Sequence, residues 1–112
     1  MNTDWASIAY HEIIEAGDDW ADKDSAAKFL DDTRKPTLAQ ITNKMDASSQ
    51  AAKDSLARAH PDYNEHLLKL RNARKAANLA RVKYDAAKTL ASLRQTQESL
   101  KKAEMKIGGM VT

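Results

Sequence analysis

The side chains of this chain that could do chemistry begin with a histidine and its acidic neighbours. His11-Glu12-Ile13-Ile14-Glu15 starts like the H-E-x-x-H zinc pattern, in which two histidines one helical turn apart hold the metal. Glu15 stands where the second histidine is required, so the segment has no chelating pair. We interpret it as the exposed polar face of a helix.

A second candidate is the acidic cluster of Asp18, Asp19, Asp22 and Asp24. A calcium-binding EF-hand loop needs glycine at its sixth position and a bidentate glutamate at its twelfth. Counting from Asp18 or from Asp22 reaches neither residue. The cluster is interpreted as a solvated helix start, where carboxylates complement the helix dipole.

The remaining histidines also lack partners for chemistry. His60 and His66 flank a turn without the Glu-x-x-His spacing of di-iron sites, and we interpret both as surface residues. The chain has no cysteine, which excludes disulfides and thiol nucleophiles. It also has no Gly-x-Ser-x-Gly motif and no glycine-rich phosphate loop. We predict that the protein is not an enzyme and has no catalytic residue, metal site or cofactor.

Charge is spread unevenly along the chain, although the net charge is only +2. Residues 1–35 hold nine acidic and four basic residues, whereas residues 69–112 hold three acidic and eleven basic ones. Basic side chains follow one flank of the last predicted helix, and they are Arg71, Arg74, Arg81 and Lys88. This flank is a candidate for contact with a nucleic-acid phosphate backbone. The alternatives are a solvated flank, or one paired with the acidic head of another chain.

The elements that must position these residues are helices. Only three glycines and two prolines occur, and no stretch alternates apolar and polar residues as a strand does. We predict one all-α domain over residues 1–112, with helical segments at about 4–33, 37–59 and 62–107. Residues 46–59 are only weakly amphipathic, which leaves open a loop followed by a short helix.

Several residues mark the predicted helix boundaries. Gly17, followed by Asp18 and Asp19, leaves open whether the first segment is one helix or two. Pro36 is predicted to end that segment, with Thr37 and Gln40 forming a capping box for the next one. The last helix is predicted to start at an Asp62 N-cap and to stop at Gly108-Gly109.

The last helix decides the predicted architecture. Its 46 residues would measure roughly 70 Å, about twice the diameter of a compact 112-residue domain. It is also apolar on two sides, which indicates packing on two sides. The alanine-rich face includes Leu70, Ala77, Tyr84 and Ala91. The opposite face includes Leu79, Val82, Leu90, Leu93 and Leu100.

We therefore predict a long C-terminal helix with shorter N-terminal helices, forming an antiparallel hairpin or bundle that oligomerisation completes. Both apolar faces are assigned to the oligomer interface, because a neighbouring helix can approach the alanine-rich face closely. An antiparallel dimer or tetramer is expected. The alternative is a monomeric hairpin in which the helix folds onto residues 4–33.

The sequence pattern resembles that of small helical proteins encoded by tailed temperate bacteriophages and prophages. Five segments carry the resemblance, namely residues 5–9 (WASIA), 35–39 (KPTLA), 72–86 (NARKAANLARVKYDA), 94–98 (RQTQE) and 103–105 (AEM). The resemblance implies an accessory role in the early or recombination region of a phage genome. It supplies no catalytic residue.

These observations together lead to two hypotheses of function. The first is a phage accessory protein that binds helix to helix, first to itself and then to an unidentified phage or host protein, possibly in DNA recombination or replication. The second is a DNA-binding accessory factor that uses the basic flank. No apolar run is long enough to cross a bilayer, so we expect no membrane partner and a location in the bacterial host cytoplasm.

Overall fold

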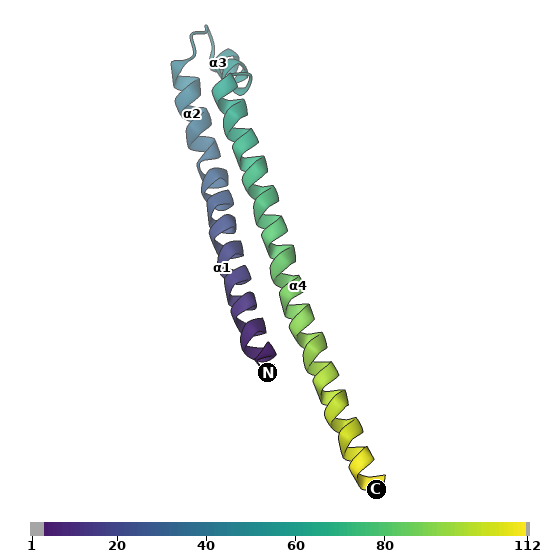
Figure 1. Ribbon diagram of the computed structural model, residues 1–112. Helices are drawn as coiled ribbons and strands as arrows, with labels where there is room; N and C mark the ends of the chain where they lie inside the picture. The colour runs from purple at the N-terminus through teal and green to yellow at the C-terminus, as the bar shows by residue number, and fades with distance from the viewer. Residues whose placement is uncertain (1–3, 112) are drawn as a thin grey trace.

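The computed structural model describes residues 4–111, which form four helices and no strand (Figure 1). These helices are α1 (Trp5–Asp32), α2 (Arg34–Lys44), α3 (Gln50–Arg58) and α4 (Pro61–Val111). α1 and α2 follow one another along one side of the rod, α3 lies at the turn, and α4 returns antiparallel to α1. The prediction of an all-α chain with a long C-terminal helix is confirmed.

The molecule is a rod because α4 is much longer than any other helix. Its extents are 93 × 20 × 16 Å and its radius of gyration is 25.3 Å, against about 13 Å for a compact chain of this length. The first residue of α1, Trp5, lies beside Ala91 and Gln95 of α4. The rest of α4, residues 96–111, extends past α1 (Figure 1), and we call it the overhang.

The contact between α1 and α4 is made largely of small residues, and we call it the alanine seam. Ala9, Ala27, Ala77 and Ala80 are each at most 7% exposed. Small side chains allow two helix axes to approach to the lower end of the usual distance, about 8 Å. The residues of the alanine seam are therefore buried because the two helix backbones lie close together, and not because large side chains cover them.

Gly17 belongs to the same contact. A Cβ atom added there would lie 3.2 Å from Cε1 of Tyr84, which is closer than an unstrained contact allows. α1 continues through this position without interruption, so the structure answers the open question in favour of one helix. The glycine gives room to the tyrosine ring instead of breaking the helix.

A small apolar core holds the turn end of the rod. Ile41 from α2, Ala57 from α3 and Tyr63 from α4 are buried together, and Leu38, Met45 and Leu67 pack against them. Ser49 caps α3 by accepting a hydrogen bond from the Ala52 N–H at 3.1 Å, as N-cap serines do. The predicted middle segment is thus two helices joined by a short loop.

The predicted boundary at Pro36 is wrong by a few residues. The break lies at Thr33, and Pro36 is the third residue of α2, where its missing N–H costs nothing because first-turn N–H groups have no partner within the helix. The Thr37 N–H donates to the Thr33 carbonyl at 3.0 Å. Thr37 is therefore inside α2, and the capping box with Gln40 is also wrong.

Both predicted ends of α4 need correction. Pro61 is the first helical residue, a position that proline favours, and the His60 ring nitrogen Nδ1 accepts the Asp62 N–H at 3.0 Å. His60 thus provides the cap that was assigned to Asp62. At the other end, α4 continues through Gly108-Gly109, because glycine permits a left-handed stop but does not impose one.

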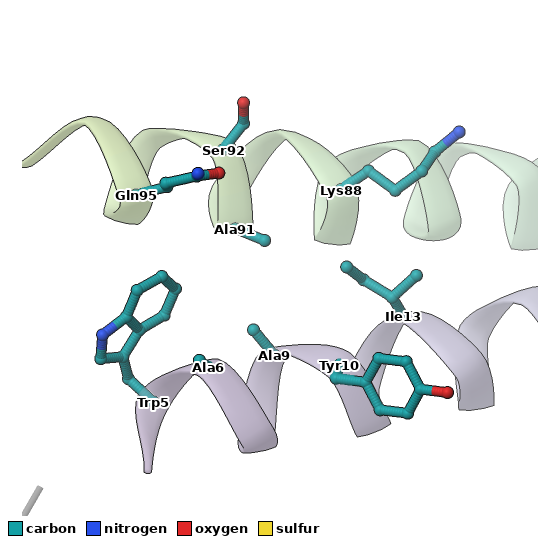
Figure 2. A pocket seen from close by; sticks show the side chains of 9 residues that line it. All are labelled: Trp5, Ala6, Ala9, Tyr10, Ile13, Lys88, Ala91, Ser92 and Gln95. Atoms are coloured by element: carbon teal, nitrogen blue, oxygen red, sulfur yellow. The ribbon is translucent and has the colours of Figure 1, made fainter. Parts of the chain in front are cut away.

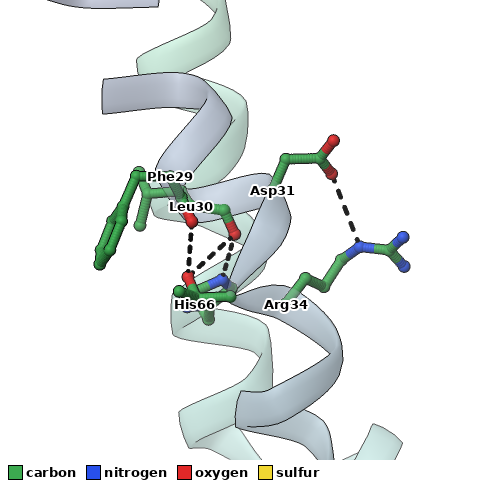
Figure 3. Close-up of polar contacts among 6 residues, drawn as sticks. Phe29, Leu30, Asp31, Arg34 and His66 are labelled. Carbon is green, nitrogen blue, oxygen red and sulfur yellow. Dashed lines mark hydrogen bonds and ion pairs between the residues drawn. The ribbon is translucent and has the colours of Figure 1, made fainter. Parts of the chain in front are cut away.

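His66 is not the free surface residue that its sequence context suggested. Its Nε2 lies 2.8 Å from the Leu30 carbonyl, near the end of α1 (Figure 3). The Thr33 hydroxyl donates to the Phe29 carbonyl at 2.8 Å and approaches the Leu30 carbonyl at 3.3 Å. These contacts satisfy carbonyl groups at the end of α1 and tie the α1–α2 junction to α4.

Overpacking should test the alanine seam. Ala27 is fully buried, so Ala27→Leu should lower the free energy of unfolding by about 1–3 kcal/mol, because three added carbon atoms have no space. Ala26→Leu, one residue away and exposed, should change it by less than about 0.5 kcal/mol. Urea unfolding followed by circular dichroism at one protein concentration would compare them. Equal effects at the two positions would contradict the close seam.

Candidate binding surface on the long helix

The two apolar faces of α4 have different environments in the structure. The alanine-rich face packs against α1 of the same chain over the length of the hairpin. Of its predicted interface residues, Ala77 is 2% exposed, and Leu70, Tyr84 and Ala91 are half-buried. This face is therefore covered within the chain, as the hairpin alternative expected.

The opposite face of α4 is open along its whole length, and we call it the leucine stripe. Leu79, Val82, Leu93 and Leu100 are 56–63% exposed, and Leu90 is 46% exposed. Ile107 continues the stripe into the overhang at 62% exposure. The leucine stripe consists of Leu79, Val82, Ala86, Leu90, Leu93, Leu100 and Ile107. No other part of the chain that the structure describes covers it.

An aromatic cluster fixes the middle of the hairpin. The rings of Trp20 and Tyr84 stack with centroids 5.6 Å apart at an interplanar angle of 25°. The Lys88 ammonium lies 4.3 Å from the centre of the Tyr84 ring, within the range of a cation–π contact. The sequence pattern predicted Tyr84 on the alanine-rich face, but its pairing with Trp20 depends on how α1 and α4 align.

An open apolar groove lies between the first turns of α1 and the end of the paired part of α4 (Figure 2). Trp5, Ala9 and Ile13 point from α1 toward Ala91 and Gln95 on α4. Neither Trp5 nor Ile13 was identified from the sequence as part of a site, because the groove depends on how α1 and α4 align. The groove shows that α1 and α4 pack less closely where α1 begins and the overhang starts.

The basic flank is largely occupied by acidic groups of the same chain. Arg74 lies 3.7 Å from Asp24 of α1. Within α4, Asp85 lies 4.0 Å from Arg81 and 3.6 Å from Lys88. Arg71 is exposed. The four predicted nucleic-acid contacts therefore share one flank, but two carboxylates offset part of their charge, and these exposed pairs are individually weak.

The acidic residues of α1 do not form a metal site. Glu12, Glu15, Asp19 and Asp22 line one open side of the helix, and Asp19 is paired with Lys23 at 2.8 Å. Over residues 4–109, no three histidine or carboxylate side chains come close enough together to hold a metal ion. These carboxylates are exposed to solvent, and Asp19 has its lysine partner one helical turn away.

No family model, curated protein or solved structure matches this chain. Among the described helices, none has an apolar stretch long enough to cross a membrane. The leucine stripe is an extended line of exposed apolar side chains on the described part of the chain.

Contact between the basic flank and DNA is a prediction that oligonucleotide binding can check. It requires affinity that falls steeply with salt, because binding releases counterions from phosphates. The triple variant Arg74→Gln, Arg81→Gln and Lys88→Gln should then weaken binding at least tenfold at low salt. The matched control replaces Lys101, Lys102 and Lys106 of the overhang with glutamine, which removes the same charge elsewhere. A labelled oligonucleotide that shows no salt-sensitive shift would eliminate this function.

Proposed function

We propose that this chain is a non-enzymatic binding protein that acts through helix-to-helix contact, first with a second copy of itself and then with another protein. The observation that carries the proposal is the leucine stripe. It is a line of exposed apolar residues on one side of α4, opposite the side that α1 covers. A helix that is apolar on two sides is stable in water when both sides are covered.

The amount of exposed surface supports the same proposal. The chain exposes 8616 Å² of surface at a mass of 12.4 kDa, whereas a compact monomer of that mass exposes about 6,100 Å². Among the described residues, no large side chain is completely buried. A single copy thus gains little from hydrophobic burial, which is the main favourable contribution to folding, and a second copy would supply more.

The size of the stripe fits a binding surface. From Leu79 to Ile107 it spans about 42 Å of helix, and at about 10 Å wide it covers roughly 400 Å². This is about the size of the largest apolar patch on a typical monomer, and such patches are often functional. Single exposed apolar residues, such as Phe29 on α1 at 66% exposure, carry no such meaning.

Charge placed in the stripe should abolish self-association. Wild-type protein is expected to show at least a dimeric mass by light scattering, and Leu93→Glu with Leu100→Glu should weaken association at least 100-fold, because a carboxylate in an apolar interface loses its hydration. Met105→Glu is the matched control, since Met105 is an apolar overhang residue, 73% exposed, on a different side of α4. A monomeric mass for the wild type at high protein concentration would contradict the proposal.

We further propose, on the sequence resemblance alone, that this binding serves phage or prophage DNA recombination or replication in the bacterial cytoplasm. The stripe, or the groove beside Trp5, would then meet a phage or host protein. Gene neighbourhood tests this directly. A recombinase or single-strand-binding gene beside this one would support the role, and a position among genes unrelated to phage would oppose it.

A further inference from the structure

The exposed side of α4 carries a heptad repeat that extends beyond its leucines. Spacings of three and four residues alternate without interruption from residue 79 to residue 107. The repeat positions are Leu79, Val82, Ala86, Thr89, Leu93, Thr96, Leu100, Ala103 and Ile107. Every one of these residues is exposed. Four successive heptads of this kind are the pattern of a coiled-coil seam.

The repeat is divided between two structurally different parts of α4. Its first half, as far as Leu93, lies on the hairpin and is backed by α1 across the alanine seam. Its second half lies on the overhang, which α1 does not reach (Figure 1). Leu93 is the midpoint of the repeat and stands close to where α1 begins.

From this division we infer that two copies pair antiparallel through the heptad repeat, with their two-fold axis between Thr89 and Leu93. Each overhang then lies on the partner's hairpin, against the part of α4 that includes Leu79 and Ala86. This inference rests on the proposed self-binding and specifies its orientation. In a parallel pair, by contrast, the two overhangs would be supported only by each other.

The sizes of the repeat residues favour the antiparallel orientation. One set of positions holds Leu79, Ala86, Leu93, Leu100 and Ile107, and the other holds Val82, Thr89, Thr96 and Ala103. Parallel helices pair each set with itself, which would stack leucine on leucine and threonine on threonine. Antiparallel helices whose axis lies between Thr89 and Leu93 pair one set with the other, for example Leu79 with Ala103 and Leu93 with Thr89. Large residues then mostly meet smaller ones, and the layers fill evenly.

Thr96 is compatible with burial in such an interface. The Thr96 hydroxyl donates to the Ser92 carbonyl of its own helix at 3.1 Å. Its donor is therefore satisfied inside α4, and covering it does not leave an unpaired polar hydrogen. Thr96 can therefore face Ala86 of the other copy without a polar partner from that copy.

The buried area requires most of the repeat to be used. A contact over residues 79–103, about 36 Å long and 10–12 Å wide, buries roughly 700–850 Å² over both copies, which is in the range of small, weak specific interfaces. A pair that used only the overhangs, from Thr96 onward, would bury less than half of that. Centring the axis between Thr89 and Leu93 brings residues 79–103 of both copies into contact, which is most of the repeat.

Spin labels on the full-length chain can measure this orientation, because the chain has no cysteine of its own. Gln97→Cys and Glu104→Cys place labels beside the stripe at two exposed positions. With the axis between Thr89 and Leu93, the paired labels lie about 18 Å apart along the rod for Gln97 and about 39 Å apart for Glu104. In a parallel pair both separations along the rod are close to zero. Pulsed dipolar spectroscopy distinguishes these values, and circular dichroism confirms that each variant is helical.

Each outcome decides one question. A short distance at Gln97 with a distance above 30 Å at Glu104, both lost when Leu100→Glu is added, supports the antiparallel pair. Short distances at both positions overturn the orientation and leave the proposed self-binding intact. A dimeric mass without a short distance at Gln97 overturns the use of the repeat. A monomeric mass for wild-type protein overturns both the inference and the proposed function.

Discussion

The structure depends on the close approach of α1 to α4 along the alanine seam. Because Ala9, Ala27, Ala77 and Ala80 project little from their helices, the contact is narrow and the two backbones lie near each other. Gly17 extends this closeness to the Tyr84 ring. A contact of this kind aligns two helices accurately along their length, but it buries little apolar surface per residue.

The consequence is a long helix with unequal surroundings. α1 covers one side of α4 for part of its length and leaves the leucine stripe and the overhang open. Since no large side chain among the described residues of one copy is completely buried, much of the apolar surface available for stabilisation lies on its outside. The same leucines would then stabilise both the fold and the self-associated form. The free energy of unfolding would therefore depend on protein concentration.

Polar groups mainly set the alignment of the hairpin. His66 on α4 reaches the Leu30 carbonyl near the end of α1, and Arg74 lies near Asp24 on the facing helix. The exposed ion pair contributes little energy, but the partly buried histidine contact satisfies a carbonyl group at a helix end. These two contacts, with the Trp20–Tyr84 stack, specify one register among the several that a row of alanines would accept.

The sequence by itself determined the helical class, the unbroken length of α4 and the membership of its two apolar faces, because these depend on local propensity and on a period of 3.6 residues. Capping and helix-stop preferences wrongly predicted N-caps at Thr37 and Asp62 and a helix end at Gly108. A single cap changes the free energy of a helix end by only about 1 kcal/mol, so neighbouring residues can shift the end. Only the tertiary structure decided that α1 of the same chain covers the alanine-rich face and that the Tyr84 ring packs against Gly17. Periodicity shows which side of a helix is apolar, whereas the identity of the covering segment depends on shape complementarity between residues distant in the chain.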